Sequence, residues 1–385
     1  MDFSVTDEQA MLADSVARFI ENDYDFDTRQ KIAAGNARFS GEMWQTFAEL
    51  GWTAVPFDEA DGGLGGGPVE LMLMMEQFGR GLVVEPYLPT VVLAGGVLRR
   101  TANAAQKERW LTPLIRGNLQ AALAFAEPQS RFDLADISTT ATNEDTHDTN
   151  EDTHYLLNGR KSFVLNGGDA DLLIIPARTG GQMRDRDGIS LFALAADAPG
   201  IKRNPYPTVD AHSAAEVVLT DVIAPPDAVL GNAGDGFETL RAAIDDATLA
   251  VSAEATGILR TMHDKTVEYS KSRVQFGVPI GTFQALQHRM VDMLMVCEQC
   301  RSLLLWTAMV AASGGVDAPR AISALKYQIG SSGRLVAQEA VQIHGGMGVT
   351  WELDIAHYFK RFTAIETLFG NSDFHLDRYV DLSSN

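Results

Sequence analysis

Near its C-terminus the chain reads "TAIETLFGNSDF", residues 363–374, which places one carboxylate beside an apolar step and a polar turn. Glu366 is a candidate general base, because glutamate is one of the side chains that enzymes use to take up protons. Phe369 cannot accept a proton, whereas Asn371 and Asp373 in the following turn can form hydrogen bonds. Whether the chain is a catalyst depends on which of these side chains does chemistry.

A second stretch, "AVQIHGGMGVTWELDIAHYFKR" at residues 340–361, combines polar side chains with glycines. Gln342 and His344 are polar residues on an otherwise apolar helix, and Gly345, Gly346 and Gly348 remove the side chains from the segment that follows. Bare backbone at a helix end permits the close approach of a large ligand, with N–H groups facing it. On the glycines alone, a helix stop followed by a loop is an equal alternative.

A third stretch, "SRVQFGVPIGTFQALQHRMVDM" at residues 272–293, places Arg273 and Gln284 on either side of a turn. A guanidinium suits a pyrophosphate, because it is permanently charged and forms two parallel hydrogen bonds. The alternative is a surface arginine in a helix–helix connection.

Three further patterns are better explained as structural. Cys297 and Cys300 form a C-x-x-C without a second pair, so we expect two buried thiols. His147 and His154 belong to a repeated "NEDTH" that fits a solvated loop better than a metal site, and we expect no metal. The glycine-rich segment 58–70 lacks a phosphate-loop pattern, which favours a flexible connector.

Composition limits the classes of function. The chain has 385 residues, a formal net charge of −20 and 45% hydrophobic residues, which is typical of a globular protein. So acidic a surface repels nucleic acid, although a local pocket of arginines and N–H groups can still bind an anionic cofactor. The chain contains no apolar run long enough to span a membrane and begins with the polar "MDFSVTDEQA", so we expect a cytoplasmic protein.

Periodicity predicts an α+β fold with three domains. Residues 1–120 show helical spacing, residues 121–234 contain short apolar runs typical of an antiparallel β-sandwich or barrel, and residues 235–385 contain long helical stretches. The last region predicts a four-helix bundle that also packs against other subunits.

Together these motifs resemble the acyl-CoA dehydrogenase family over nearly the whole chain. The resemblance is carried by the α–β–α order, "KSFVLNGGDAD" at 161–171, the R-x-x-F-G…F-Q segment and the Q-I-H-G-G-x-G segment. It implies an FAD at a subunit interface, with the neighbouring subunit contacting the adenine and pyrophosphate. The implied contacts are Arg273, Phe276, Gln284, Gln342, Gly345 and Gly346, and further Asn371 and Asp373.

The resemblance also implies a reaction and its partners. The family removes two hydrogens from the Cα–Cβ bond of an acyl-CoA thioester: a glutamate takes the α-proton and a hydride passes to flavin N5. Electrons usually leave through an electron-transfer flavoprotein, and members assemble as homotetramers or heterotetramers.

The sequence departs from the family where the catalytic glutamate should stand. The usual base position is Phe369, and the alternative position on the first long bundle helix is Ala247. Neither can accept a proton, so we assign no catalytic residue. The side chain of Asp246 is rotated by about 100° around the helix relative to Ala247, and Glu366 lies three residues before Phe369. We therefore expect both carboxylates to point away from the flavin site.

The segments that resemble the flavin-facing strands have changed as well. The family's T-E-P-G-A-G-S-D is replaced here by residues 126–133, in which Ala126 lacks the hydroxyl and Gln129, Arg131 and Phe132 replace small residues. In the W-I-T-N counterpart, Leu165 stands in place of the second threonine.

These losses favour a division of labour. We expect a base-lacking subunit that completes the FAD site of a related catalytic subunit, as in bacterial heterotetramers acting on bulky acyl-CoAs such as steroid side chains or dicarboxylic acids. Two alternatives remain open: a self-sufficient dehydrogenase whose base is Asp246 or Glu366, and a flavin-free acyl-CoA-binding or scaffold protein.

Overall fold

The computed structural model describes residues 4–35, 37–144 and 154–383, in two compact units. Unit 1 comprises Met1–Lys31, Gly67–Val83 and Thr248–Asn385, and unit 2 comprises Ile32–Gly66 and Val84–Ala247. Along the chain, helices are followed by a β-sheet and then by long helices, so the predicted fold class is confirmed.

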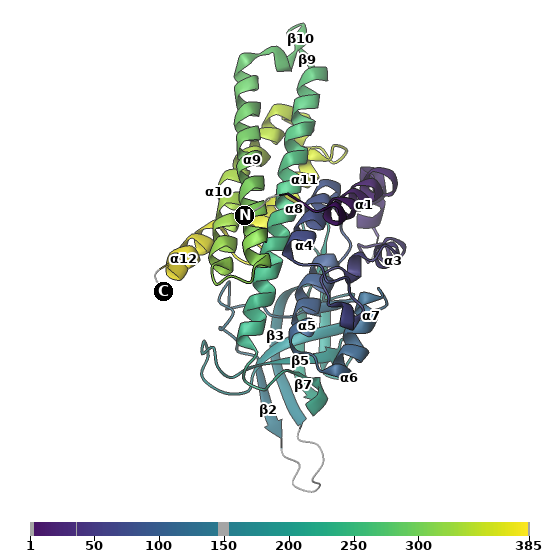
Figure 1. Cartoon of the computed structure of the whole chain (residues 1–385), viewed down its shortest axis with the longest axis vertical. Coiled ribbons are helices and arrows are strands. Elements are labelled where there is room, and N and C mark those ends of the chain that lie inside the picture. Colours follow the sequence, from purple (N-terminus) through teal and green to yellow (C-terminus); the bar gives the residue numbers. More distant parts are fainter. Residues whose placement is uncertain (1–3, 36, 145–153, 384–385) are drawn as a thin grey trace. The chain divides into compact units, whose positions relative to one another are not determined.

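Unit 1 is a helical bundle. Figure 1 shows its three longest helices, α8, α9 and α10, running side by side. α10 packs against α9, α11 and α12, while α4 packs against α1 and α9. The helices are α1 Asp7–Asp23, α2 Phe26–Ala33, α4 Pro68–Gly81, α8 Phe237–Ser272, α9 Gln284–Ala312, α10 Ala318–His344, α11 Ile355–Thr367 and α12 Ser372–Ser383. The end of α2 and the first turns of α8 belong to unit 2.

Local sequence accounts for several features of this bundle. Thr6 and Gln9 form the expected capping box at the start of α1. Gly79 of α4 and Gly257 of α8 allow two helices to touch, because a Cβ at either would lie 2.0 or 1.9 Å from a carbonyl oxygen of the other helix. Cys297 and Cys300 are both buried in α9, as predicted. By length and composition α9 also meets the criterion for a membrane span, as core helices of bundles do.

Short elements join the long helices. A β-hairpin of β9 Val274–Gln275 and β10 Val278–Pro279 connects α8 to α9 and is followed by the 3₁₀ turn η6 Ile280–Thr282. A second 3₁₀ segment, η7 Gly345–Val349, follows α10.

Unit 2 is built on an eight-stranded sheet with strand order β6-β7-β3-β2-β4-β5-β8, and β1 adds to β4. Its core contains Leu157, Ile175, Phe192 and Val217. The strands are β1 Ala121–Leu123, β2 Thr140–Glu144, β3 His154–Leu165, β4 Leu172–Arg178, β5 Ile189–Ala195, β6 Ile201–Pro207, β7 Ser213–Ala224 and β8 Val229–Leu230. The shorter helical segments are α3 Gly41–Glu49, η1 Trp52–Ala54, η2 Glu59–Asp61, η3 Leu88–Ala94, α5 Gly95–Thr101, α6 Ala104–Gln106, η4 Lys107–Leu111, α7 Thr112–Ile115 and η5 Pro226–Ala228.

Two expectations require correction. The sheet is not purely antiparallel, because β1 pairs with β4 in parallel register and β2 touches β4 in parallel at Thr140. The glycine-rich segment is not a flexible connector: backbone hydrogen bonds from Gly63, Leu64, Gly65 and Gly66 to residues 54–58 fold it into a defined turn. The domain boundaries at residues 120 and 234 stay a prediction, and His147 lies outside the described residues.

Candidate cofactor-binding site

The hairpin segment and the end of α10 lie together in unit 1. Arg273 directly precedes β9 and Phe276 lies in the turn between β9 and β10, while Tyr269, in the last turn of α8, stacks on His344 with ring centroids 4.3 Å apart. His344 is two residues beyond Gln342. The structure therefore brings the R-x-x-F-G and Q-I-H-G-G motifs, which are about 70 residues apart in sequence, close together in space.

An ion pair brings the third motif to the same place. Arg289 of α9 pairs with Glu339 of α10 through a short contact between Nε and Oε2. Gln284 begins the helix that carries Arg289, and Gln342 lies one turn beyond Glu339. Six of the eight predicted cofactor contacts therefore belong to segments that meet at one end of the bundle.

This end of the bundle is solvent-exposed in the single chain. Phe276 is 93% exposed, and Arg273, Gln284 and Gln342 are exposed as well. The surrounding segments present further exposed apolar side chains: Val274, Val278, Phe283, Met347, Val349 and Trp351. Exposed apolar groups at this density are typical of a surface that a ligand or another protein chain covers.

The two glycines at the end of α10 leave backbone open for a ligand. Gly345 has φ +62°, a conformation that favours glycine. Gly346 has no such strain, and a Cβ added there would meet no atom within 4 Å. Nothing in the described part of the chain therefore requires a glycine at 346, which fits close approach by a group outside the chain.

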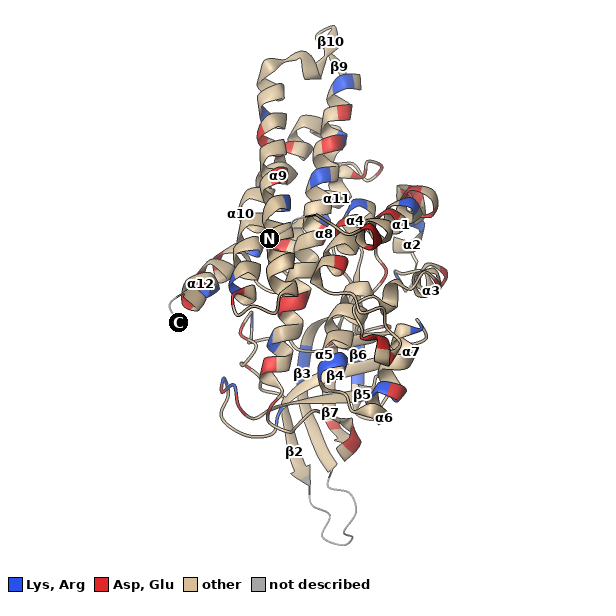
Figure 2. Ribbon diagram, viewed as in Figure 1, with Lys and Arg blue, Asp and Glu red and all other residues tan. Residues whose placement is uncertain are grey.

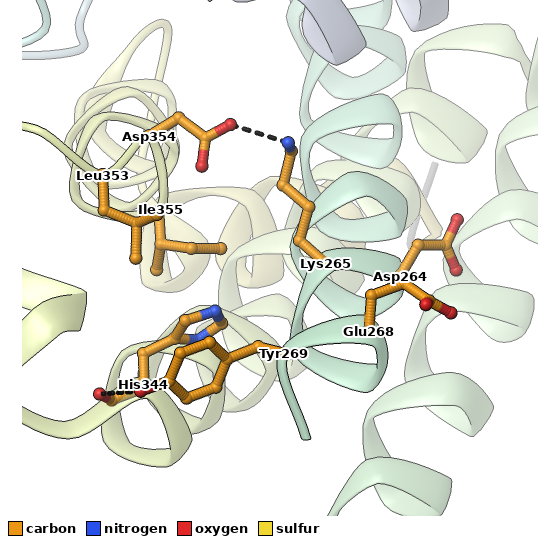
Figure 3. Close-up of a pocket in the computed structure, with 8 residues that line it drawn as sticks. All are labelled: Asp264, Lys265, Glu268, Tyr269, His344, Leu353, Asp354 and Ile355. Carbon is orange, nitrogen blue, oxygen red and sulfur yellow. Dashed lines mark hydrogen bonds and ion pairs between the residues drawn. The ribbon is translucent and has the colours of Figure 1, made fainter. Parts of the chain in front are cut away.

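A cavity of about 400 Å³ lies beside this region (Figure 3). It is lined by Asp264, Lys265, Glu268, Tyr269, His344, Leu353, Asp354 and Ile355, none of which is a predicted FAD contact. Its charged groups already have partners: Lys265 pairs with Asp354, Asp264 with Arg260, and Glu268 with Lys271. We therefore do not assign this cavity to the cofactor.

Charge is distributed unevenly around the candidate site. Figure 2 shows acidic residues spread along the helices and loops of both units, whereas the β9–β10 hairpin itself is largely uncharged. Arg273 is thus a cation in a chain with a net charge of −20. A local cation of this kind can attract a pyrophosphate that the rest of the surface repels.

The remaining two predicted contacts lie at the turn between α11 and α12. Asn371 Oδ1 accepts a hydrogen bond from Phe374 N at 3.0 Å, so this side chain caps α12. Asp373 is exposed in the first turn of α12. The capping role explains Asn371 without a ligand, and its amide N–H groups stay available for a cofactor.

The two positions at which the family carries its base hold the apolar side chains of Phe369 and Ala247. Phe369 is 9% exposed and has φ +59°, in the left-handed region that non-glycine residues rarely occupy. Ala247 is fully buried in α8. Neither side chain can exchange a proton.

The two displaced carboxylates both have close polar partners. In unit 2, Asp246 Oδ2 lies 2.7 Å from guanidinium nitrogens of both Arg99 and Arg100. In unit 1, Glu366 Oε1 accepts hydrogen bonds from Ser372 N and Oγ at 3.4 and 3.3 Å. Each carboxylate is thus held by partners within its own unit, which disfavours both as bases.

In unit 2 the structure joins the two segments that resemble flavin-facing strands. Ser162 N donates to the backbone oxygen of Ala126 at 2.9 Å, which places residue 163 beside the altered 126–133 loop. Glu127 in that loop forms a fully buried ion pair with Lys161. Burial raises the pKa of Glu127, but the Lys161 ammonium and hydrogen bonds outweigh it and lower that pKa to about 2. Gln129 donates to Glu127, so a bulky side chain occupies the place of the family's first loop glycine.

Sequence reasoning missed Lys326 and His375, which lie beneath the base-position loop. Lys326 is 1% exposed, and burial lowers its pKa to about 7 although the Glu366 carboxylate opposes the shift. His375 is fully buried, and burial together with Lys326 and Arg378 lowers its pKa to about 3. A lysine in register with the apolar stripe of α10 was the only available signal.

The shifted pKa of Lys326 predicts a stability that depends on pH. Between about pH 7 and the ordinary lysine pKa of 10.5, the unfolded chain keeps a proton that the folded chain has lost. The unfolded state then binds more protons, so stability from this group increases with pH by about 1 kcal/mol per unit. Urea unfolding across this range should show that Lys326→Met has a flatter pH dependence than the wild type. Identical slopes would contradict the assignment.

Three comparisons identify proteins that this chain resembles. Family models described as acyl-CoA dehydrogenase N-terminal, middle and C-terminal domains match residues 6–118, 122–222 and 234–381. The chain is 31% identical to a short-chain-specific acyl-CoA dehydrogenase of Megasphaera elsdenii, over 94% of each chain.

Solved structures agree with the sequence relatives. The FAD complex of PigA superposes with a TM-score of 0.91 at 26% identity, covering 100% of this chain and 99% of the other. A variant of the Tcur3481-Tcur3483 steroid ACAD gives a TM-score of 0.85 at 27% identity, covering 98% of both chains.

Proposed function

This chain belongs to the acyl-CoA dehydrogenase family, and we propose that it is the base-lacking subunit of a two-component, FAD-dependent acyl-CoA dehydrogenase. Members of the family are oxidoreductases, and FAD-bound neighbours such as PigA make FAD the expected cofactor. The proposal concerns what this particular subunit contributes.

One observation carries the proposal. Apolar residues occupy both base positions, at Phe369 and Ala247, while Arg273, Gln342 and Gly346 keep their chemistry and stay exposed at one end of the bundle. A chain that catalysed alone would need a proton acceptor at one of these two base positions. A chain that completes a neighbour's cofactor site needs only the exposed cofactor contacts.

Each retained group has a defined task in this proposal. The Arg273 guanidinium pairs with the pyrophosphate, Gln284 and Gln342 hydrogen-bond to the nucleotide, and the bare backbone at Gly345 and Gly346 lets it lie close. Phe276 supplies an apolar surface for the adenine. Bound FAD would supply the hydride acceptor for the reaction, and the partner subunit would supply the proton acceptor.

The altered loop of unit 2 supports the same interpretation. Ala126 and Leu165 offer no hydroxyl, and Gln129 fills space beside Glu127. A flavin held by this subunit's own β-domain would therefore lack two hydrogen-bond donors. We propose one FAD per pair of subunits rather than one per chain.

The similarity to the Tcur3481-Tcur3483 steroid ACAD, whose name joins two components, supports a two-component assembly and a bulky acyl-CoA. We propose a heterotetramer of two such pairs in the cytoplasm that passes electrons to an electron-transfer flavoprotein. A self-sufficient dehydrogenase using Asp246 or Glu366 is the second candidate, and a flavin-free scaffold the third.

Co-expression tests the proposal. The chain should purify colourless or with little flavin alone, but as a yellow α2β2 complex with one FAD per pair when co-expressed with a family member that carries a glutamate base. Mass photometry gives the subunit composition of the complex, and flavin absorbance gives the number of FAD molecules per pair of subunits. A homotetramer with one reducible FAD in every chain would overturn the proposal. Loss of that activity in Asp246→Ala or Glu366→Ala would then identify the displaced base.

A further inference from the structure

The segment between α11 and α12 is held by two buried side chains that the proposed cofactor contacts do not use. Lys326 Nζ donates to the backbone oxygens of Glu366 at 3.0 Å and Gly370 at 2.8 Å. His375 Nε2 lies 3.1 Å from the backbone oxygen of Phe369. Because a carbonyl oxygen can only accept, Nε2 carries the hydrogen and donates it. Three carbonyls within five residues are therefore fixed from α10 and α12.

Burying these two side chains is unfavourable unless the loop needs them. An amine loses its hydration when it is buried, and His375 Nδ1 has no hydrogen-bond partner among the described residues. Apolar residues would fill the same space at a lower cost in desolvation. They would, however, leave the oxygens of Glu366, Phe369 and Gly370 without these donors, and buried carbonyls without partners are strongly disfavoured.

The loop conformation needs such support. Phe369 adopts φ +59°, which costs about 1 kcal/mol or more for a residue with a Cβ. The loop also determines where α12 begins, because Asn371 directly follows it and caps that helix. The conformation is therefore set by backbone contacts on either side of Phe369 rather than by a hydrogen bond of the Phe369 side chain.

We propose that Lys326 and His375 are positioning residues that fix the backbone of residues 366–370 independently of the side chain at position 369. The amine donates in both of its protonation states, so the contacts persist as Lys326 titrates. We call this pair of residues, with its hydrogen bonds to the loop carbonyls, the clamp. By fixing the loop, the clamp also positions Asn371 and Asp373, which follow it. That consequence rests on the proposed function, whereas the clamp itself can be tested without any cofactor.

Hydrogen–deuterium exchange of the full chain tests the clamp. Lys326→Met and His375→Leu act from different helices on different carbonyls. Each should speed exchange in a peptide spanning 366–377 by about tenfold, as expected for the loss of a buried hydrogen bond, and leave a peptide from α9 unchanged. Phe369→Gln should stay within about twofold of the wild type. Lys265→Met, which removes a more exposed lysine of the same unit, is the matched control and should not affect the peptide.

The outcomes separate the clamp from a general effect on packing. After correction for intrinsic exchange, wild-type protection should not fall as the pH rises through the range in which Lys326 titrates, because opening the loop exposes the amine. Lys326→Gln, which keeps a donor, should retain more of the wild-type protection than Lys326→Met, and His375→Leu carries the test should Lys326→Met not fold. Faster exchange in Phe369→Gln than in the Lys326 and His375 variants, or unchanged protection in both of those variants, would overturn the inference.

A second readout uses the complex. FAD affinity should fall several-fold in Lys326→Met and His375→Leu and stay unchanged in Phe369→Gln. If the wild-type complex holds no FAD at this interface while the exchange pattern appears as expected, the proposed function fails and the clamp stands. If the complex binds FAD but the loop stays protected in both variants, the clamp fails and the proposed function stands.

Discussion

Replacing Arg273 by alanine is expected to lower the affinity of the two-component complex for FAD on the order of a hundredfold. A guanidinium that pairs with a pyrophosphate at a subunit interface is desolvated on both sides, and removing one partner of such a pair costs about 2–5 kcal/mol. The chain itself should stay folded, because Arg273 is exposed and lies between α8 and β9, outside both elements. Titration of the apo-complex with FAD, followed by flavin fluorescence, measures the effect.

Two matched variants show whether the loss arises from the cofactor contact. Arg320→Ala removes another accessible arginine of unit 1, at the start of α10 and paired with Asp317, and should leave the FAD affinity unchanged. Gly346→Val adds a side chain where the chain itself has open space. It should leave the melting temperature of the isolated chain close to that of the wild type and still weaken FAD binding. Equal FAD affinities for Arg273→Ala and Arg320→Ala would show that the cofactor site does not lie at this end of the bundle.

The sequence predicted the long helices of unit 1 well because each carries a sustained apolar face. α8 and α9 begin close to the expected positions, and the break between their apolar periodicities falls at the hairpin, which contains Gly277 and Pro279. Periodicity could not predict that β1 runs parallel to β4. β1 has only three residues, all apolar and all buried, so neither alternation nor a turn signal specifies its partner.

The sequence indicated the candidate cofactor contacts, which stay a prediction, but not the two buried residues that hold the loop before Asn371. Arg273 and Gln342 belong to motifs whose chemistry can be recognised in the sequence. The burial of Lys326 cannot be recognised in this way, because a lysine on a long helix usually reaches solvent. Its register with Ile322, Leu325 and Ile329 was the available signal, since these positions form the buried face of α10. His375 gave no signal, because its burial depends on how α12 returns against α10.

The other large expected effect concerns the buried ion pair between α8 and α11. Glu254 and Arg361 have side chains only 4% and 5% exposed, and Arg361 donates from Nε and NH2 to the two carboxylate oxygens at 2.5 and 2.7 Å. Arg361→Leu is expected to lower the free energy of unfolding by about 3–5 kcal/mol, because it leaves an uncompensated buried carboxylate. Such a loss is a large fraction of the roughly 5–15 kcal/mol that stabilises a typical domain.

Urea unfolding with circular dichroism measures this loss, and a double variant shows its cause. Glu254→Leu combined with Arg361→Leu should recover most of the stability, since two apolar side chains leave no charge unpaired. Arg260→Ala breaks the exposed ion pairs with Asp264 and Glu298 and should cost about 1 kcal/mol or less. If the double variant were as unstable as Arg361→Leu alone, the damage would come from lost packing between the helices. The charge pair would then not be what fixes α11, and with it the start of the base-position loop, against α8.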